Sequence, residues 1–141
     1  MLYVKGDLIE AFKSGEVQAI AHSCNCFNTM GSGVALAIKN GIPEAYKADC
    51  ETVKGAHSKL GKHSMSVTVE GYVFNLYGQY NYGKDGAKYT KYKSLYLAML
   101  SMAEKLKDIG FTGSIGFPKL GAGTGGGSWV MIRELIEEVF Q

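Results

Sequence analysis

A glycine-rich loop near the end of the chain constrains the fold most strongly. Residues 117–129 read FPKLGAGTGGGSW, with five glycines in the seven positions from 121 to 127. A short β-type run precedes this loop and an amphipathic helical pattern follows it. Glycine at such density is costly to order, so it is typical of backbone that approaches a ligand or needs a positive φ. Because exposed N–H groups next to a helix N-terminus bind anions, the loop predicts a phosphate site.

A second polar loop, residues 22–33 (HSCNCFNTMGSG), also joins an apolar strand pattern to a helix pattern. In a mainly parallel sheet all such loops emerge at the carboxyl edge, so we expect the two loops to be neighbours. Two helix N-termini would then face one crevice, which suits two phosphates, or one phosphate and a polar sugar. Neither loop matches the Walker A or the dinucleotide pattern. A glycine-rich connection without a ligand is the alternative.

The rest of the chain alternates strand and helix patterns, which predicts an α/β fold around a mixed, largely parallel sheet. We expect strands over residues 2–5, 17–22 and 112–117, a hairpin-like pair over 67–77 and a long loop over 78–91. Helices are expected over 8–13, with Asp7 as the cap, and over 34–40, 43–54, 95–110 and 130–140. The 141 residues fit one domain, 1–141.

Composition argues against several classes of protein. With 46% hydrophobic and 20% charged residues the chain is typical of a globular domain, and its net charge of +2 gives no strong nucleic-acid signal. The cysteines, Cys24, Cys26 and Cys50, are too few for a disulfide framework or a zinc site, so no metal is expected. His57 and His63 are expected to be solvated. Without a signal peptide or membrane-length apolar run, we expect a cytoplasmic protein that does not bind membranes.

Three separated motifs resemble the macro domain family. They are Gly6-Asp7-Leu8, residues 22–35 and residues 117–129, in matching order and spacing along almost the whole chain. Within this family the chain most resembles the branch that includes the yeast-type ADP-ribose-1″-phosphate phosphatase and the terminal ADP-ribose protein glycohydrolase. The resemblance implies a three-layer α/β/α fold and a pocket for ADP-ribose or a phosphorylated derivative, with no cofactor.

The resemblance also implies roles for individual residues. Asp7 would accept a hydrogen bond from the adenine amino group beside the Leu8 backbone, and Asn25 would meet the distal ribose. The remaining contacts would come from the two loops: Gly31, Ser32, Gly33 and Val34 in the first, and Gly121, Gly123, Thr124, Gly125 and Gly126 in the second.

The sequence departs from the family pattern in two respects. The glycohydrolase branch uses a nucleophilic lysine and a loop aspartate where this chain has Gln79 and Gly125, which argues against that covalent route. Lys84 or Lys88 could reach the site, although loop lysines are usually solvated. The usual C-terminal strand, whose end often supplies an adenine-stacking aromatic residue, is also missing. Candidate substitutes are Tyr80, Tyr82 and Tyr89, which could equally be packing residues.

His22 is the remaining candidate for chemistry, since a histidine suits acid–base catalysis near neutral pH and the phosphatase branch has one in the same His-x-Cys-Asn-Cys motif. A structural histidine at the sheet edge is the alternative. The leading prediction is an ADP-ribose-1″-phosphate phosphatase with His22 and Asn25 as catalytic residues. A non-catalytic ADP-ribose reader, or a hydrolase of protein- or nucleic-acid-linked ADP-ribose, are the alternatives.

Overall fold

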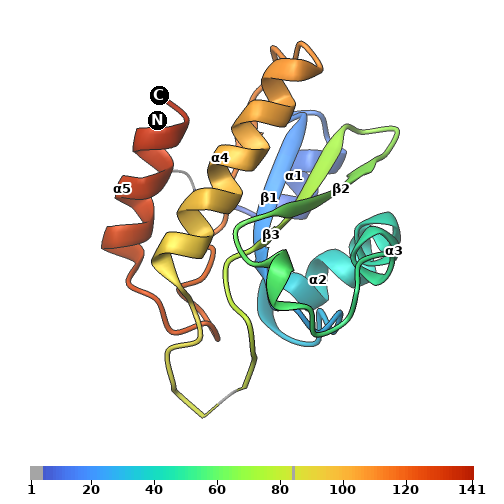
Figure 1. The fold of residues 1–141 in the computed structure, drawn as a ribbon. Coiled ribbons are helices and arrows are strands. Elements are labelled where there is room, and N and C mark those ends of the chain that lie inside the picture. Colours follow the sequence, from blue (N-terminus) through green and yellow to red (C-terminus); the bar gives the residue numbers. More distant parts are fainter. Residues whose placement is uncertain (1–4, 84) are drawn as a thin grey trace.

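The computed structural model describes residues 5–83 and 85–141, in which helices and strands alternate along the chain (Figure 1). The elements in order are α1 (Leu8–Lys13), β1 (Ala19–Cys24), α2 (Gly33–Gly41), α3 (Pro43–Cys50), the 3-10 turn η1 (His57–Lys59), β2 (His63–Val67), β3 (Tyr72–Tyr77), α4 (Tyr92–Asp108), β4 (Ile115–Gly116) and α5 (Trp129–Val139). The strand expected over 2–5 falls on residues 1–4, outside the described part, apart from its last residue.

The sheet is mixed and largely parallel, as expected. Its order is β2-β3-β1-β4, with β1 parallel to both β3 and β4 and with β2 antiparallel to β3. The predicted hairpin-like pair is therefore present as β2 and β3. The three parallel strands end at one edge of the sheet, where the chain leaves each of them in a loop.

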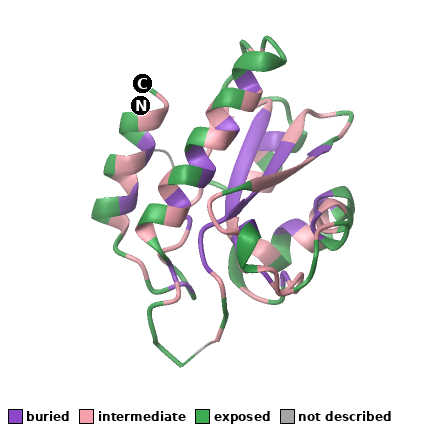
Figure 2. Ribbon diagram, in the orientation of Figure 1, coloured by how far each residue is buried: buried purple, intermediate pink, exposed green. Residues whose placement is uncertain are grey.

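Helices cover both faces of the sheet and make the fold a three-layer α/β/α structure. Side chains alternate between the faces, so Ala19 and Ala21 of β1 pack with α4 and α5, while Ile20 packs on the other face with residues of α1, α2 and α3. Figure 2 shows the central strand β1 buried between the two helical layers. Strands that are buried on both faces are typical of parallel sheets. These strands hold the first residues of the loops that follow them.

Several boundaries differ from the sequence-based expectations. The helix expected over 43–54 ends at Cys50, where the Thr52 hydroxyl donates to the Asp49 carbonyl at 2.5 Å. The strand expected from Val67 begins at His63, and β4 is only two residues long. The expectation that His63 is solvated is wrong: its side chain is half-buried, and Nδ1 lies 2.6 Å from the Ser101 hydroxyl.

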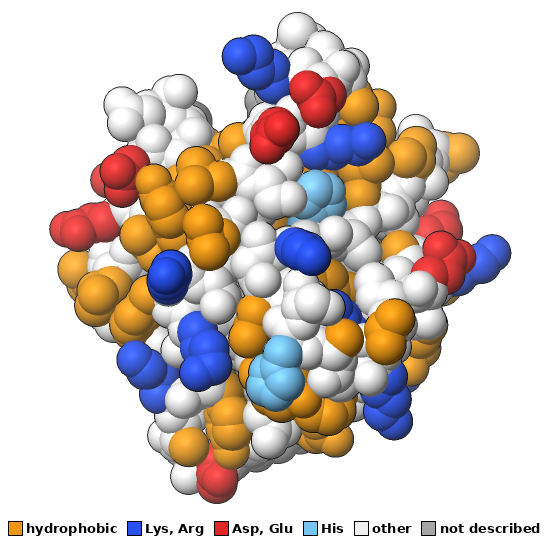
Figure 3. All heavy atoms as spheres, in the orientation of Figure 1, with side chains coloured by type: hydrophobic (Ala, Val, Ile, Leu, Met, Phe, Trp, Pro, Cys, Tyr) orange, Lys and Arg blue, Asp and Glu red, His pale blue; other side chains and the backbone are white. Residues whose placement is uncertain are grey.

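The surface carries charges of both signs. Figure 3 shows lysine and acidic side chains interspersed over one face, in agreement with the small net charge. In the described part of the chain, no helix combines the length and apolar character that spanning a membrane would require.

Candidate functional site

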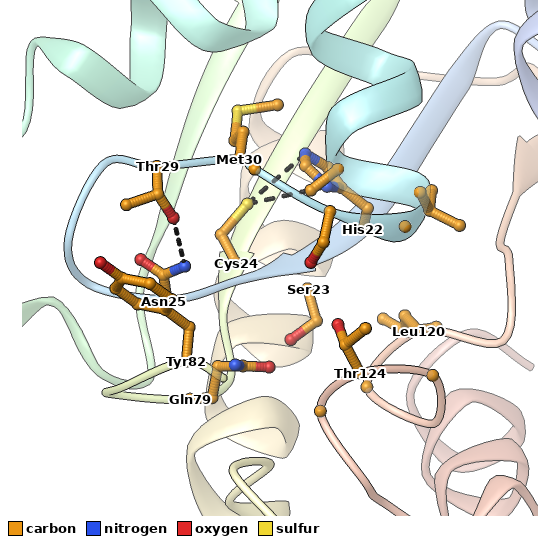
Figure 4. Close-up of a pocket in the computed structure, with 18 of the residues that line it drawn as sticks. His22, Ser23, Cys24, Asn25, Thr29, Met30, Gln79, Tyr82, Leu120 and Thr124 are labelled. Carbon is orange, nitrogen blue, oxygen red and sulfur yellow. Dashed lines mark hydrogen bonds between the residues drawn. The ribbon is translucent and has the colours of Figure 1, made fainter. Parts of the chain in front are cut away.

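A cavity of about 500 Å³ opens at the carboxyl edge of the sheet, where β3, β1 and β4 end (Figure 4). Its walls come from three loops that follow these strands: residues 25–33, 79–83 and 118–125. The two loops singled out in the sequence therefore border one cavity, which confirms that they are neighbours. The loop after β3 supplies the third wall.

The first wall is a tight turn between β1 and α2. The Asn25 side chain stabilises this turn. Its Nδ2 donates to the Thr29 hydroxyl at 2.7 Å (Figure 4). Its Oδ1 accepts a hydrogen bond from the Phe27 N–H at 2.7 Å. Asn28 and Met30 adopt positive φ of 57° and 42°, a conformation that costs energy in residues other than glycine. Ser32 at the start of α2 forms no side-chain capping bond, so the first-turn N–H groups remain available to an anion.

The second wall is the glycine-rich loop, which is fastened to the loop after β3. The Thr90 hydroxyl donates to the Gly121 carbonyl at 2.6 Å, and the N–H groups of Tyr89 and Thr90 donate to the Gly125 carbonyl at 2.7 and 2.9 Å. Within the loop the Gly127 N–H donates to the Gly121 carbonyl at 2.8 Å. These bonds fix the backbone so that the other N–H groups of the loop can face a ligand.

Gly125 cannot be replaced without movement of its neighbours. A Cβ atom there would lie 2.5 Å from the Thr90 hydroxyl oxygen and 2.9 Å from Gln79 Oε1. Gln79 and Gly125 are therefore adjacent in space, and the amide of Gln79 borders the space that a side chain at 125 would need. Gln79 is itself buried, and its Nε2 donates to the Asn81 carbonyl at 2.9 Å.

Residues 21–136 match the model of the macro domain family. The chain belongs to this family. The match covers all three loops that surround the cavity.

Known relatives agree with this assignment. An uncharacterised 17.5 kDa protein of Enterobacteria phage T4 is 36% identical over 96% of this chain and 86% of its own length. A DNA ADP-ribosyl glycohydrolase of Thermus aquaticus is 28% identical over 99% of this chain, which spans only 37% of that longer protein. An ADP-ribose 1″-phosphate phosphatase of the yeast Meyerozyma guilliermondii is 42% identical over 37% of this chain and 29% of its own.

The fold also matches a solved macro domain. The macrodomain of Thermus aquaticus DarG superposes with a TM-score of 0.75 at 25% identity, covering 96% of this chain and 87% of the solved one.

Most of the residues predicted for the ligand line the cavity of this macro domain: His22, Asn25, Gly31, Ser32, Gly33, Val34, Gly121, Gly123, Thr124 and Gly125. Asp7, Leu8 and Gly126 do not border it. Asp7 instead caps α1, where its Oδ1 accepts from the N–H groups of Ile9 and Glu10 at 2.9 and 3.1 Å. Gly126 faces the neighbouring loop, because a Cβ there would lie 2.7 Å from the Ala87 carbonyl oxygen.

His22 lies inside β1 and is 1% exposed. This burial favours the interpretation of His22 as a structural residue over a catalytic one. Asn75 Nδ2 donates to the Ala45 carbonyl at 2.9 Å, so Asn75 Oδ1 must accept from His22 Nε2–H at 2.6 Å. This bond leaves Nδ1 of the neutral ring unprotonated. Burial lowers the His22 pKa to about 4, against which the Asn75 bond acts weakly, so the ring is neutral at pH 7 and cannot serve as an acid there.

The two ends of the cavity differ. β3 and β4 flank β1 on opposite sides, and α1 lies at the β4 side, where Leu8 contacts Gly116. The end of the cavity on the β4 side therefore lies toward α1, while Asn25, Gln79 and Tyr82 line the end nearest β3. Both Asn25 and Tyr82 are labelled among the lining residues in Figure 4.

Aromatic rings gather at the β3 end. We call Phe27, His57, Tyr80 and Tyr82 the aromatic mouth. Tyr82 borders the cavity and is 51% exposed, and its ring centroid lies 6.1 Å from that of Phe27. Phe27 in turn meets Tyr80 edge-on at 4.9 Å, and His57 stacks on Tyr80 at 3.6 Å.

Three other candidates of the long loop, Tyr80, Tyr89 and Lys88, are not among the residues that line the cavity. The Tyr89 hydroxyl donates to Asp85 at 2.9 Å. Lys88 Nζ lies 4.5 Å from the centre of the Tyr92 ring rather than in the cavity. Lys84 lies outside the described residues.

Sequence reasoning missed Asp49, Thr29, Met30 and Lys119, which also line the cavity. Thr29 and Met30 lie within the polar loop of residues 22–33, but Asp49 comes from α3 and no local sequence pattern marks it. Cys24 and Cys26 are buried, and burial raises the pKa of both thiols, so they are unreactive at pH 7. Among residues 5–83 and 85–141 no three His, Cys, Asp or Glu side chains are arranged to hold a metal ion.

Proposed function

We propose that this macro domain binds ADP-ribose conjugates and hydrolyses the bond at C1″ of the distal ribose, releasing free ADP-ribose from a nucleobase. Family membership supports the ligand, and the two loops supply rows of backbone N–H groups suited to a diphosphate. The relatives supply the reaction class, since one matched along nearly the whole chain is a DNA ADP-ribosyl glycohydrolase.

The two ends of the cavity suggest how ADP-ribose would lie. Adenine would occupy the end nearest α1, the helix that Asp7 caps through Oδ1. The diphosphate would lie between the α2 N-terminus and the loop at Gly121 to Gly125. The distal ribose would then meet Asn25 and Gln79, with C1″ and its substituent directed toward the β3 end.

The aromatic mouth is the observation that carries the choice of a nucleobase. An exposed Tyr82 ring, backed by Phe27 and Tyr80, offers a stacking surface where the leaving group would emerge. Stacking on an aromatic side chain contributes about 1–3 kcal/mol per base. It needs no strong positive field, which agrees with a net charge of only +2.

The neutral pair Gln79 and Gly125 favours direct attack by water. Gln79 cannot form a covalent adduct with the sugar as a lysine could, and the space beside Gly125 leaves no room for an added carboxylate. Catalysis would then depend on holding the ribose and a water in line, with neutral amide dipoles near the charge that develops on the sugar.

The test is a panel of conjugates with mass-spectrometric detection of free ADP-ribose. We expect release from an oligonucleotide that carries ADP-ribose on a base, and slower release from an ADP-ribosylated peptide. Binding of ADP-ribose in calorimetry with no turnover of any conjugate would instead make the protein a reader.

ADP-ribose-1″-phosphate phosphatase activity is the second candidate. It is favoured by the 42% identity to such a phosphatase over part of the chain and by the sequence His22-Ser23-Cys24-Asn25-Cys26. The same panel decides it: rapid release of inorganic phosphate from ADP-ribose-1″-phosphate, with no release from the oligonucleotide, would select this activity.

A further inference from the structure

The charges of the chain are distributed unevenly along it. Residues 54–93 hold seven lysines and only two acidic residues, whereas the other 101 residues hold eight basic and eleven acidic side chains. This basic segment runs from the connection after α3 to the first turn of α4, and it includes three of the four rings of the aromatic mouth. The small net charge of the whole chain therefore conceals a local excess of positive charge.

Lys54 lies beside the aromatic mouth. The next residue, Gly55, donates its N–H to the Cys26 carbonyl at 2.7 Å, and its own carbonyl accepts from the Tyr80 hydroxyl at 2.8 Å. A Cβ atom on Gly55 would lie 3.4 Å from the Phe27 ring. The backbone that carries Lys54 is thus packed against two rings of the mouth, and Lys54 itself is exposed.

Lys91 lies at the same end of the cavity, just before α4. Its N–H donates to the Gly78 carbonyl at 2.8 Å, and the preceding residue, Thr90, forms a β-bridge with Gln79. Because Gln79 lines the cavity, the backbone of Lys91 lies directly beside the third wall. Lys91 is also exposed.

Lys88 belongs to the part of the long loop that packs against the mouth. Its Nζ lies 4.5 Å from the centre of the Tyr92 ring, a cation–π contact that orders this long side chain. The next residue, Tyr89, lies against Gly83, which lines the cavity together with Tyr82. The exposed Lys88 is therefore held next to the strand of loop that carries the exposed ring of Tyr82.

The charges of these three lysines are not neutralised by direct contacts. Within residues 5–83 and 85–141, no acidic side chain forms an ion pair with Lys54, Lys88 or Lys91. The acidic residue of the long loop, Asp85, instead accepts from the Ala87 N–H at 3.0 Å and from the Tyr89 hydroxyl at 2.9 Å. Exposed ammonium groups without a carboxylate partner are available to anions from solution.

We propose that Lys54, Lys88 and Lys91, which we call the lysine rim, bind the phosphodiester backbone of a single-stranded nucleic acid whose ADP-ribosylated base stacks on Tyr82. This inference rests on the proposed release of ADP-ribose from a nucleobase, since that reaction places the base at the aromatic mouth. Proteins that bind single strands combine cations for the phosphates with aromatic rings for the bases. The strand is single because a base that stacks on Tyr82 has left its own stack.

The aromatic rings favour a nucleic acid over an acidic peptide as the occupant of this surface. Carboxylates bind lysines, but they gain nothing from the 51% exposed Tyr82 ring or from the His57 and Tyr80 rings stacked at 3.6 Å. Each nucleotide brings one phosphate and one flat base. It therefore matches a surface on which cations and rings lie side by side.

The experiment measures the binding of a fluorescent single-stranded oligonucleotide without ADP-ribose, by anisotropy, between about 50 and 200 mM salt. Three phosphate contacts predict a slope of about 2 for log Kd against log salt concentration. In the variant Lys54→Gln, Lys88→Gln, Lys91→Gln the slope should fall below about 1, and Kd at the lowest salt should rise by about tenfold. The matched control is Lys13→Gln, Lys105→Gln, Lys107→Gln, which removes the same charge from the end of α1 and the far end of α4 and should leave slope and Kd unchanged.

Equal slope and affinity in wild type and the lysine-rim variant would overturn the proposal. It would also be overturned by an oligoglutamate peptide of matched charge that binds as tightly as the oligonucleotide. The Kd for ADP-ribose should change by less than about threefold in the lysine-rim variant, because the rim does not line the cavity and its charges are screened. Strand binding that depends on the rim, without release of ADP-ribose from any conjugate, contradicts only the proposed function.

Discussion

The chemistry of His22 is decided by its neighbours rather than by its motif. In sequence it stands where an acid–base residue is expected, yet it is buried within β1 and its Nε2–H donates a hydrogen bond to Asn75 Oδ1. A ring with a pKa of about 4 is neutral over the physiological range. We therefore expect His22 to matter more for stability than for proton transfer.

The stability of the protein should fall in mild acid because of His22. Folding lowers the pKa of His22 from 6.5 to about 4. The contribution of His22 to the free energy of unfolding is therefore fully present above pH 6.5 and is lost as the pH falls toward 4. The loss over this window is about 3 kcal/mol. Urea unfolding at pH 7 and pH 4.5 measures it, with His22→Gln as the comparison. Asp49, whose pKa is raised, acts in the opposite direction in both proteins. An equal pH dependence in wild type and His22→Gln would refute this account.

Tyr82 is the residue that should distinguish leaving groups. Tyr82→Ala removes the exposed ring of the aromatic mouth, so kcat/KM for a base-linked conjugate should fall by about tenfold, as loss of one stacking contact predicts. Tyr82→Phe keeps the ring and should keep the rate. Neither change should alter the Kd for ADP-ribose itself, and equal losses for base-linked and peptide-linked conjugates would argue against a base at the mouth.

At the scale of elements, the two loops that follow β3 and β4 behave as one unit. The carbonyls of Gly121 and Gly125 accept hydrogen bonds from Tyr89 and Thr90, and within the loop after β3 Gln79 pairs with Thr90. The glycine-rich loop thus owes its shape to a partner loop as much as to its own sequence. A substitution that displaces the backbone of either loop should therefore displace both.

A methyl group at position 125 tests this coupling. Gly125→Ala would bring a Cβ within 2.5 Å of the Thr90 hydroxyl oxygen and 2.9 Å of the Gly121 carbonyl oxygen. We expect a loss of about 1–3 kcal/mol in unfolding free energy, typical of overpacking, together with weaker ADP-ribose binding. The matched control is Gly123→Ala, since a Cβ there meets nothing within 4 Å. Equal stability of the two variants in denaturant melts would mean that the loops are not coupled as described.

At the scale of the whole molecule, the sequence predicts what local patterns determine. Alternating strands and helices gave the layers and the largely parallel sheet, and the strand–loop–helix order brought residues 25–33 and 118–125 to one cavity. Long-range packing decides the rest. Asp49 reaches the cavity from α3, Tyr82 from a loop without periodicity, and the partners that bury His22 come from β3 and α3. No local signal marks these contacts.

The central claim is that water attacks C1″ directly and frees ADP-ribose from a base. It is tested most directly by quenching a reaction with the base-linked oligonucleotide and recording free ADP-ribose and the intact protein mass together. We predict that free ADP-ribose accumulates while the protein mass stays unchanged. Accumulation of an ADP-ribosylated protein, or no release of ADP-ribose at all, would contradict the claim.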